Sequence, residues 1–406
     1  MTIVKTILNQ MPTVRQPQAK FLDTLFATIL ALRGHVTYRN LSRYCDYSER
    51  TLARQFRAAC DWLTFHRLTC AQVVTKADVW IAAQDASFLP KSGKHTFGLG
   101  AFFNGCAGRP ERGLEISTVA LINVTQRYAL TQAVAQTPPG SAEKSARAAS
   151  RMTFYAQQVC AQRARIPAFV KYLAVDGAYA KVGYVEAVTT HEGWQVITKL
   201  RGDADCYFLY TKPRQPDQKG RSRKYDGKVN FQDLRRFAAV GTLPNAPHIE
   251  LYTARVWHKK LKRELRLVVL VNRKDKDKPR YIVLASTDVA LDAQTLVEYY
   301  QARFQIEFLF RDAKQFTGLS DGQMRSENAL DFHFNAALAT LNLVRVAEVK
   351  AAADQPLKVF SLASWKQRKF NERLVETIID KLELEPTAIK THPRYEEIRT
   401  YGAIAA

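Results

Sequence analysis

The chain has 406 residues, enough to bury large hydrophobic cores, and ordinary domain sizes predict two to four domains. Its 60 Lys and Arg residues against 38 Asp and Glu residues give a net charge of +22, which indicates a polyanionic partner: nucleic acid first, with a ribosome or a membrane surface as alternatives. Six scattered cysteines without CxxC pairs or nearby His suggest neither a zinc ribbon nor a disulfide framework. Because no run approaches the ~18 apolar residues of a membrane span, we expect a cytoplasmic, nucleoid-associated protein.

The first 72 residues are predicted to form a helical DNA-binding domain. Apolar residues recur at helical spacing over 21–32, Thr37 begins a second segment, and Ser48 can cap a third, which suggests a helix-turn-helix. On its last helix three cations share one face and could read DNA, although the same spacing occurs on ordinary solvated helices: Arg50, Arg54 and Arg57.

From residue 78 the pattern changes to that of strands. Segments 78–89, 94–105 and 114–124 predict an antiparallel meander, and 137–150 reads as a linker with a helix start. A helix over 147–163, a short buried strand in 171–179, a helix over 184–188 and a strand over 194–200 follow. The order βββαβαβ is that of an RNase H-like α/β core, a mixed sheet covered by helices on both faces.

The core is interrupted after residue 200. Segment 211–228 is polar and basic, and 248–257, 265–271 and 280–286 read as strands of a β-rich insertion. A long helix over 292–314 and further helices complete the chain. We therefore predict five parts: a helical DNA-binding domain (1–72), the first part of the core (73–203), the insertion (204–286), the second part of the core (287–345) and a C-terminal helical region (346–406).

The segment YQARFQIEFLFRDAK holds the most informative pattern. Tyr300, Arg303, Glu307 and Lys314 follow one another at offsets of 3, 4 and 7, which brings all four side chains to nearly one face of a helix. On spacing alone an exposed ladder of ion pairs is the more common outcome. Further acids elsewhere in the chain are needed to favour a functional site.

Two aspartates on predicted strands supply them. Alternation places Asp85 on the same face as Ile81 and Ala83, so an apolar strand carries a carboxylate into or beside the core. Asp176 follows a short apolar strand directly before Gly177, at a position where α/β sheets commonly hold functional groups. Either aspartate alone is more often a cap or a turn residue, and their combination with Glu307 is what favours a site.

A ligand set of three carboxylates without His or Cys favours Mg²⁺ or Mn²⁺ over zinc. Phosphodiester cleavage by two metal ions, about 3.5 to 4 Å apart, requires such a set. We therefore predict that Asp85, Asp176 and Glu307 are catalytic and metal-binding, and that Arg303 and Lys314 hold phosphates while Tyr300 positions the DNA backbone.

At this point the sequence resembles a known family. Tyr300, Arg303, Glu307 and Lys314 match the signature of bacterial DDE transposases of insertion-sequence family four. DASFLPKSGKHTFG resembles the family's first-aspartate region, and AVDGAYAK with GWQVITKLRGDAD resembles its second. The resemblance covers roughly residues 75 to 345. One departure is Gln84, since many relatives carry a second Asp before the catalytic one.

The resemblance implies an enzyme that binds terminal inverted repeats and cleaves the element ends, in some members through a hairpin. It then joins the 3′ hydroxyls to target DNA, and pairing two ends implies a homodimer on DNA. Family members also stack a Trp of the insertion on a flipped base, for which Trp257 is the candidate, although strand tryptophans are more often core. The alternatives are a catalytically silent DNA-binding protein or repressor on this scaffold, and a general RNase H-like nuclease or resolvase.

Overall fold

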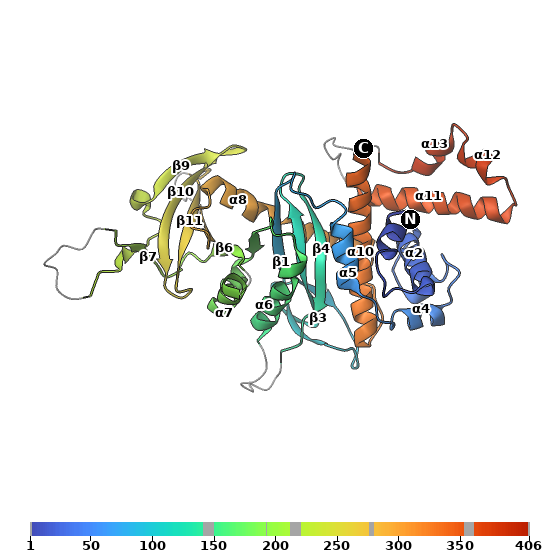
Figure 1. The fold of residues 1–406 in the computed structure, drawn as a ribbon, viewed down its shortest axis with the longest axis horizontal. Coiled ribbons are helices and arrows are strands. Elements are labelled where there is room, and N and C mark those ends of the chain that lie inside the picture. Colours follow the sequence, from blue (N-terminus) through green and yellow to red (C-terminus); the bar gives the residue numbers. More distant parts are fainter. Residues whose placement is uncertain are drawn as a thin grey trace.

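The computed structural model describes residues 2–140, 150–191, 193–211, 221–275, 280–352 and 361–404. The predicted helix start at residue 147 and half of the basic segment 211–228 therefore lie outside the described residues. Figure 1 shows an elongated molecule in which strands β7, β10 and β11 lie at one end, strands β1, β3 and β4 lie in the middle, and helices α2, α10 and α11 lie at the other end.

One large mixed sheet runs through most of the molecule. It contains twelve strands in the order β2-β3-β1-β5-β6-β12-β11-β10-β7-β8, with β4 paired to β3 and β9 paired to β10. The strands are β1 (Trp80–Pro90), β2 (Gly100–Asn104), β3 (Arg109–Asn123), β4 (Tyr128–Gln136), β5 (Tyr172–Val175), β6 (Gln195–Leu200), β7 (Cys206–Leu209), β8 (Tyr225–Lys228), β9 (Ala238–Leu243), β10 (Ala246–His258), β11 (Arg263–Asn272) and β12 (Arg280–Ser286).

Five of these strands form the core. β4, β3 and β1 pair antiparallel, and β1, β5 and β6 continue in parallel, with α6 (Arg151–Gln162) and α7 (Val182–Glu186) as the connections. The chain is thus mixed α/β with a large mixed sheet, consistent with an RNase H-like fold. All three strands of the predicted antiparallel meander are present as β1, β2 and β3, but β3 lies between the other two, residues 94–99 are not a strand, and β4, which pairs with β3, was not predicted.

The β-rich segment is continuous with the core sheet. β12 pairs antiparallel with β6 through Ser286 and Ile197, so the sheet passes from the core into β11 and β10 without an edge. All three strands predicted between residues 248 and 286 are present, and β7, β8 and β9 are additional. The sheet therefore connects the segment through hydrogen-bonded strands to β5 and β1, near which the two aspartates lie.

The N-terminal helices pack on the rest of the chain. They are α1 (Thr2–Leu8), α2 (Gln16–Ala31), α3 (Tyr38–Leu41), α4 (Glu49–Gln55) and α5 (Trp62–Cys70). As predicted, the Thr37 and Ser48 side chains cap α3 and α4 by accepting from the backbone N–H groups three residues later. Aromatic side chains of this region pack on α10 (Glu327–Ala352), where the Phe56 and Phe332 ring centroids are 4.6 Å apart.

The two faces of the sheet are buried under different helices. On β1, Ile81 and Ala83 belong to the cluster that also holds apolar residues of α8 (Ala293–Ala302), α9 (Gln305–Phe316) and α10. Trp80 and Ala82 face the cluster formed with α6 and α7. The alternation predicted for this strand is therefore confirmed, and it places Asp85 on the side of α8 and α9.

The long helix predicted over 292–314 is two helices. α8 ends at Ala302, Arg303 and Phe304 form a turn, and α9 begins at Gln305. The C-terminal helices are α11 (Leu362–Lys381), α12 (Pro386–Lys390) and α13 (Tyr395–Thr400), and α10 continues past residue 345 without a break. Within the described ranges, every helix is too short or too polar to cross a bilayer.

Candidate active site

Asp85 lies in the middle of the sheet on β1. Its neighbours on the antiparallel side belong to β3, where Thr118 is its register partner. Its side chain is 21% exposed and accepts a hydrogen bond from the N–H of Ala86 at 2.9 Å. The carboxylate is therefore held at the surface of the core.

Asp176 follows the last residue of β5, the parallel neighbour of β1. The register pairs Gln84 with Val175, so the next step along both strands brings Asp85 and Asp176 side by side. The Asp176 side chain caps the 3-10 helix η2 (Gly177–Tyr179), and Thr198 on β6 donates to its carbonyl oxygen at 3.2 Å. A Cβ at Gly177 would lie 2.9 Å from the Lys199 carbonyl oxygen, so a residue without a side chain lets β5 turn here.

Arg303 joins the strand acid to the helix acid. Its guanidinium lies 3.4 Å from an Asp85 carboxylate oxygen and 2.9 Å from a Glu307 carboxylate oxygen, and its side chain is only 4% exposed. Position 303 is the turn between α8 and α9, so the break in the helix aims the guanidinium between the two acids. A buried cation therefore fills the place between Asp85 and Glu307.

The electrostatics of Asp85 reflect this crowding. Burial raises the pKa of Asp85 to about 6, Arg303 and the Ala86 N–H oppose the rise, and the charges of Glu307 and Asp176 add to it. Burial lowers the pKa of Arg303, but the neighbouring acids outweigh it and leave this pKa above its ordinary value. The three acids thus act on one another and on the same guanidinium.

The predicted metal-binding geometry is not assembled. Over the part of the chain that the structure describes, no three His, Cys, Asp or Glu side chains form a group that could hold a metal ion. Asp85 and Glu307 instead share Arg303. The donor chemistry nevertheless fits a hard divalent cation, because the three groups are carboxylates and a single guanidinium does not neutralise them all.

Tyr300 lies with the acids, but Lys314 does not. The Tyr300 ring is 7% exposed and lies 5.5 Å from the Arg303 guanidinium, and burial raises the pKa of Tyr300 to about 12. The Lys314 ammonium donates to the backbone carbonyl of Phe88 at 2.9 Å, three residues beyond Asp85 on β1. The interrupted helix therefore does not present all four signature side chains to one point.

A buried network behind Asp85 was not foreseen from the sequence. Gln84, fully buried on the opposite face of β1, accepts from the Tyr184 hydroxyl at 2.6 Å. Its amide nitrogen lies 2.9 Å from the Tyr155 carbonyl, 3.1 Å from Gln158 and 3.2 Å from Ser117. Gln84 thus ties β1 to α6, α7 and β3. The signal available in the sequence was that Gln84 directly precedes Asp85, so strand alternation places it on the opposite face of β1.

Two exposed aromatic side chains beside Glu307 were also missed. Phe304, in the turn before α9, and Phe308 on α9 are 44% and 45% exposed, and they lie three residues before and one residue after Glu307. The Arg303 and Arg311 guanidiniums lie 4.8 and 4.9 Å from these two rings. An apolar and cationic surface therefore adjoins the acids.

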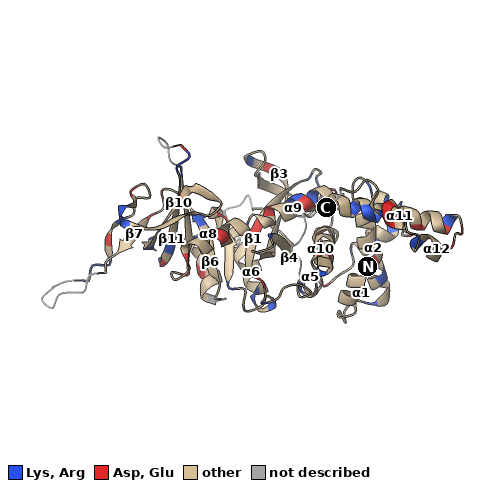
Figure 2. Ribbon diagram, turned by 90° about the horizontal axis from the view of Figure 1, so that it is seen from above, with Lys and Arg blue, Asp and Glu red and all other residues tan. Residues whose placement is uncertain are grey.

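The other residues predicted to bind DNA lie on elements that do not carry the acids. Arg50 and Arg54 are exposed on α4, whereas Arg57 lies beyond its end, so the predicted single helical face was wrong for Arg57. Trp257 on β10 is half-buried, and the Lys224 ammonium lies 3.4 Å from its ring centroid. Lys and Arg are spread along the molecule, from the end around β7 and β8 to α11 at the other (Figure 2).

The mixed sheet, with Asp85 on β1 and Asp176 directly after the adjacent β5, is consistent with an RNase H-like nuclease fold. The family model of the DDE superfamily endonucleases matches residues 10–255, more than half of the chain, and the chain belongs to this family. The matched region includes Asp85 and Asp176 and ends before α8 and α9.

Among solved structures, the piggyBac transposase in a synaptic complex with hairpin DNA is similar to the chain. The sequence identity is 12%, the TM-score is 0.46, and the match covers 100% of this chain and 81% of the other. At that TM-score the similarity does not bear on the fold or function of this chain. No curated protein matches it.

Proposed function

We propose that this chain is a DNA transposase of the insertion-sequence family four type, in which Asp85, Asp176 and Glu307 carry out phosphodiester cleavage and strand transfer. The observation that most supports this proposal is the Arg303 bridge. Arg303 contacts Asp85 on β1 and Glu307 on α9, and these two acids are 222 residues apart in the sequence. Asp176 adjoins Asp85 by register. Family membership supplies the endonuclease class.

Mg²⁺ or Mn²⁺, as two ions, would be held by Asp85, Asp176 and Glu307. When bound, such ions activate the attacking oxygen and stabilise the leaving oxygen of an in-line displacement. Burial raises the pKa of Asp85, so a bound cation would stabilise the charged form of this half-buried carboxylate. Arg303 balances that charge in the form described here.

The chain's own residues would then orient the DNA. Arg303 sits on the turn between α8 and α9, and its guanidinium, which bridges Asp85 and Glu307 without DNA, would contact a phosphate oxygen of the bound strand. Tyr300 packs against Arg303 and limits where that guanidinium can go. Lys314 fixes α9 to the carboxyl-terminal part of β1 and places a second cation beside the DNA path.

The DNA partners would be the terminal inverted repeats and target DNA. Arg50, Arg54 and Arg57 would contact the repeat, and Trp257 would stack on a flipped base, with Lys224 and the Tyr225 ring beside it. Cleavage through a hairpin would follow from that base flip. Two copies would pair two element ends, and α11 offers an exposed apolar stripe for this contact: Leu374, Ile378 and Leu382.

The test is cleavage of DNA that carries the inverted repeats flanking the reading frame, with Mg²⁺. Glu307→Gln should lower cleavage more than about 100-fold and leave repeat binding unchanged, because it removes a charged metal ligand and keeps the shape. Glu298→Gln, an exposed position on α8, is the matched control and should cleave normally. Equal cleavage by Glu307→Gln and the wild type would refute the proposal. Binding without any wild-type cleavage would identify a silent DNA-binding protein.

A further inference from the structure

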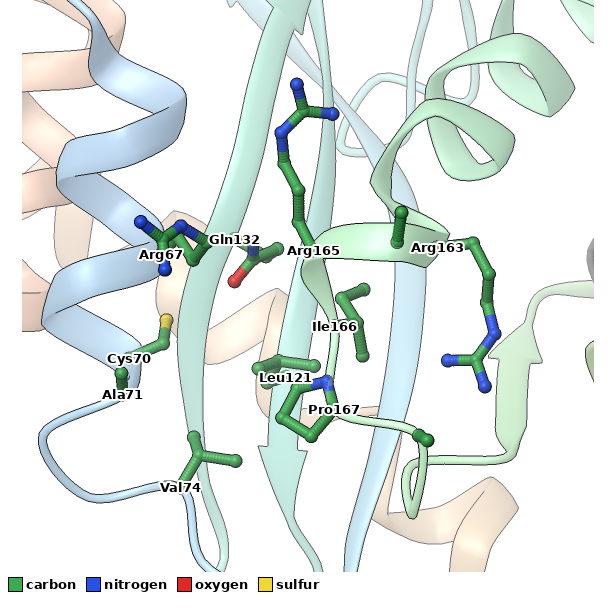
Figure 3. A pocket seen from close by; sticks show the side chains of 12 residues that line it. Arg67, Cys70, Ala71, Val74, Leu121, Gln132, Arg163, Arg165, Ile166 and Pro167 are labelled. Atoms are coloured by element: carbon green, nitrogen blue, oxygen red, sulfur yellow. The ribbon is translucent and has the colours of Figure 1, made fainter.

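A pocket of about 760 Å³ lies on the core, away from the acids. Figure 3 shows α5 on one side of it and the 3-10 helix η1 (Arg163–Arg165) with the loop after it on the other, with strands between them. That loop leads into the start of β5, whereas Asp176 follows the end of β5. The pocket and the carboxylates therefore lie at opposite ends of this strand.

A β-bulge aims one polar side chain into the pocket. The register of β3 and β4 jumps from Val119↔Ala133 to Ala120↔Thr131, so Gln132 is the extra residue and has no partner on β3. Gln132 is 1% exposed and lines the pocket, and its amide nitrogen has no hydrogen-bond partner among the described residues. An unpartnered buried donor is costly, and a ligand acceptor would satisfy it.

The bulge is held in place by the helices behind it. Asn342 on α10 accepts from the Thr131 N–H and donates to the Thr131 carbonyl, both at 2.8 Å. His66 on α5 contacts Asn342 at 3.3 Å and Asn335 at 3.2 Å. Burial lowers the pKa of His66 to about 4, so this network is neutral at physiological pH. The orientation of Gln132 is therefore a fixed feature of the fold.

The charge around the pocket has one sign. Arg67 and Arg165 are exposed at its mouth on opposite sides, and among the lining residues that the structure describes there is no Asp or Glu. The Arg165 guanidinium is held by the Ala161 carbonyl at 2.7 Å, and that of Arg163 lies 4.5 Å from the Trp194 ring and donates to the Val170 carbonyl. Arg67 and Arg165, which meet no acid among the lining residues that the structure describes, favour an anion, and phosphate above all.

The floor of the pocket is apolar. It is formed by Leu121, Ile166, Pro167 and Val74, and the Cys70 thiol at its side stays protonated because burial raises the pKa of Cys70 to about 12. The volume is within the range of ordinary small-ligand sites, roughly 300 to 1,000 Å³. The ligand should therefore combine a phosphate for the arginines with a flat or apolar part for the floor.

We propose that this pocket binds a nucleotide unit, with its phosphate at Arg67 and Arg165, its base or sugar over Leu121 and Ile166, and an acceptor on the Gln132 amide. The unit is either part of a DNA strand or a free mononucleotide. This site does not depend on the catalytic role proposed for the acids.

The experiment is calorimetric titration of the full chain with dAMP and, separately, with a single-stranded oligonucleotide. Arg67→Glu combined with Arg165→Gln should weaken binding at least about tenfold, because both positions are exposed and their loss removes the phosphate contacts. Arg127→Gln, an exposed arginine in the turn between β3 and β4, is the matched control and should bind as the wild type does. Gln132→Leu should weaken binding with the arginines intact, and its circular dichroism spectrum and unfolding midpoint verify that it folds.

The two titrations separate the sources of the ligand. Loss of dAMP binding in the double variant identifies a mononucleotide site, and loss of oligonucleotide binding alone identifies a site for a DNA strand. Either result supports the proposal. Absence of wild-type binding to both probes, or equal binding by the wild type and the double variant, overturns it. Cleavage by the wild type in the same preparations shows that such a failure leaves the catalytic proposal intact.

Discussion

Replacing Gln84 by Leu tests whether the buried network behind Asp85 stabilises the fold and positions the acid. Gln84 is fully buried, accepts from Tyr184 and has three acceptors within 3.2 Å of its amide nitrogen. An amide NH₂ has only two protons, so at most three full hydrogen bonds are lost. At about 1 kcal/mol each, and with the Tyr184 hydroxyl left unpaired, Gln84→Leu should lower the unfolding free energy by roughly 3 kcal/mol.

The assay is urea unfolding followed by circular dichroism, with exposed Gln126→Leu as the control, for which the change should stay within about 0.5 kcal/mol. Tyr184→Phe removes one of the bonds, so a double-mutant cycle with Gln84→Leu should give a coupling energy of about 1 kcal/mol. Wild-type stability of Gln84→Leu, or strictly additive effects in the cycle, would refute the reasoning.

Two further predictions concern buried charge. Without metal, Arg303→Gln should lower the unfolding free energy by about 1 to 3 kcal/mol, because Asp85 loses its neighbouring cation. Mg²⁺ should then raise the melting temperature of this variant more than that of the wild type. An equal or smaller shift with Mg²⁺ would mean that Arg303 and the metal do not compete. Because the pKa of His66 is about 4 in the folded chain and near 6.5 unfolded, its stabilising effect is complete above pH 6.5 and is lost as pH falls towards 4. Between pH 6.5 and 5 the wild type should therefore lose about 1.5 kcal/mol more than His66→Gln in urea titrations, whereas parallel profiles would exclude His66 as the source.

The parts of the fold that were predictable are those with a regular apolar pattern. β1 alternates, and β10, β11 and β12 are rich in branched and aromatic residues, so their positions follow from sequence. β4 was missed because it is buried along nearly all of its length and is built from Ala, Thr and Gln, which give no alternation. Its bulge at Gln132 is fixed by Asn342, more than 200 residues away, and no local pattern records that contact.

The sequence pattern predicted where the acids lie, but it did not predict the contacts of the cations. Strand ends and alternation place Asp85 and Asp176 on adjacent strands, and the spacing on α9 selects Glu307. The turn at Arg303 contains neither Gly nor Pro, so the sequence gives no signal for it. Arg303 and Phe304 keep helical backbone dihedral angles, and tertiary packing decides where the helix breaks. For the same reason the sequence could not show that Arg303 would bridge two acids or that Lys314 would bind a carbonyl of β1.

The most direct test of the central claim is Mn²⁺ binding to the full chain, measured by electron paramagnetic resonance without DNA. The three-acid site predicts that Asp85→Asn and Asp176→Asn each weaken binding about tenfold or more, because each removes a carboxylate ligand. Asp203→Asn, at an exposed aspartate paired with Arg201, should bind as the wild type does. Undiminished Mn²⁺ binding in both Asp85→Asn and Asp176→Asn would contradict the account.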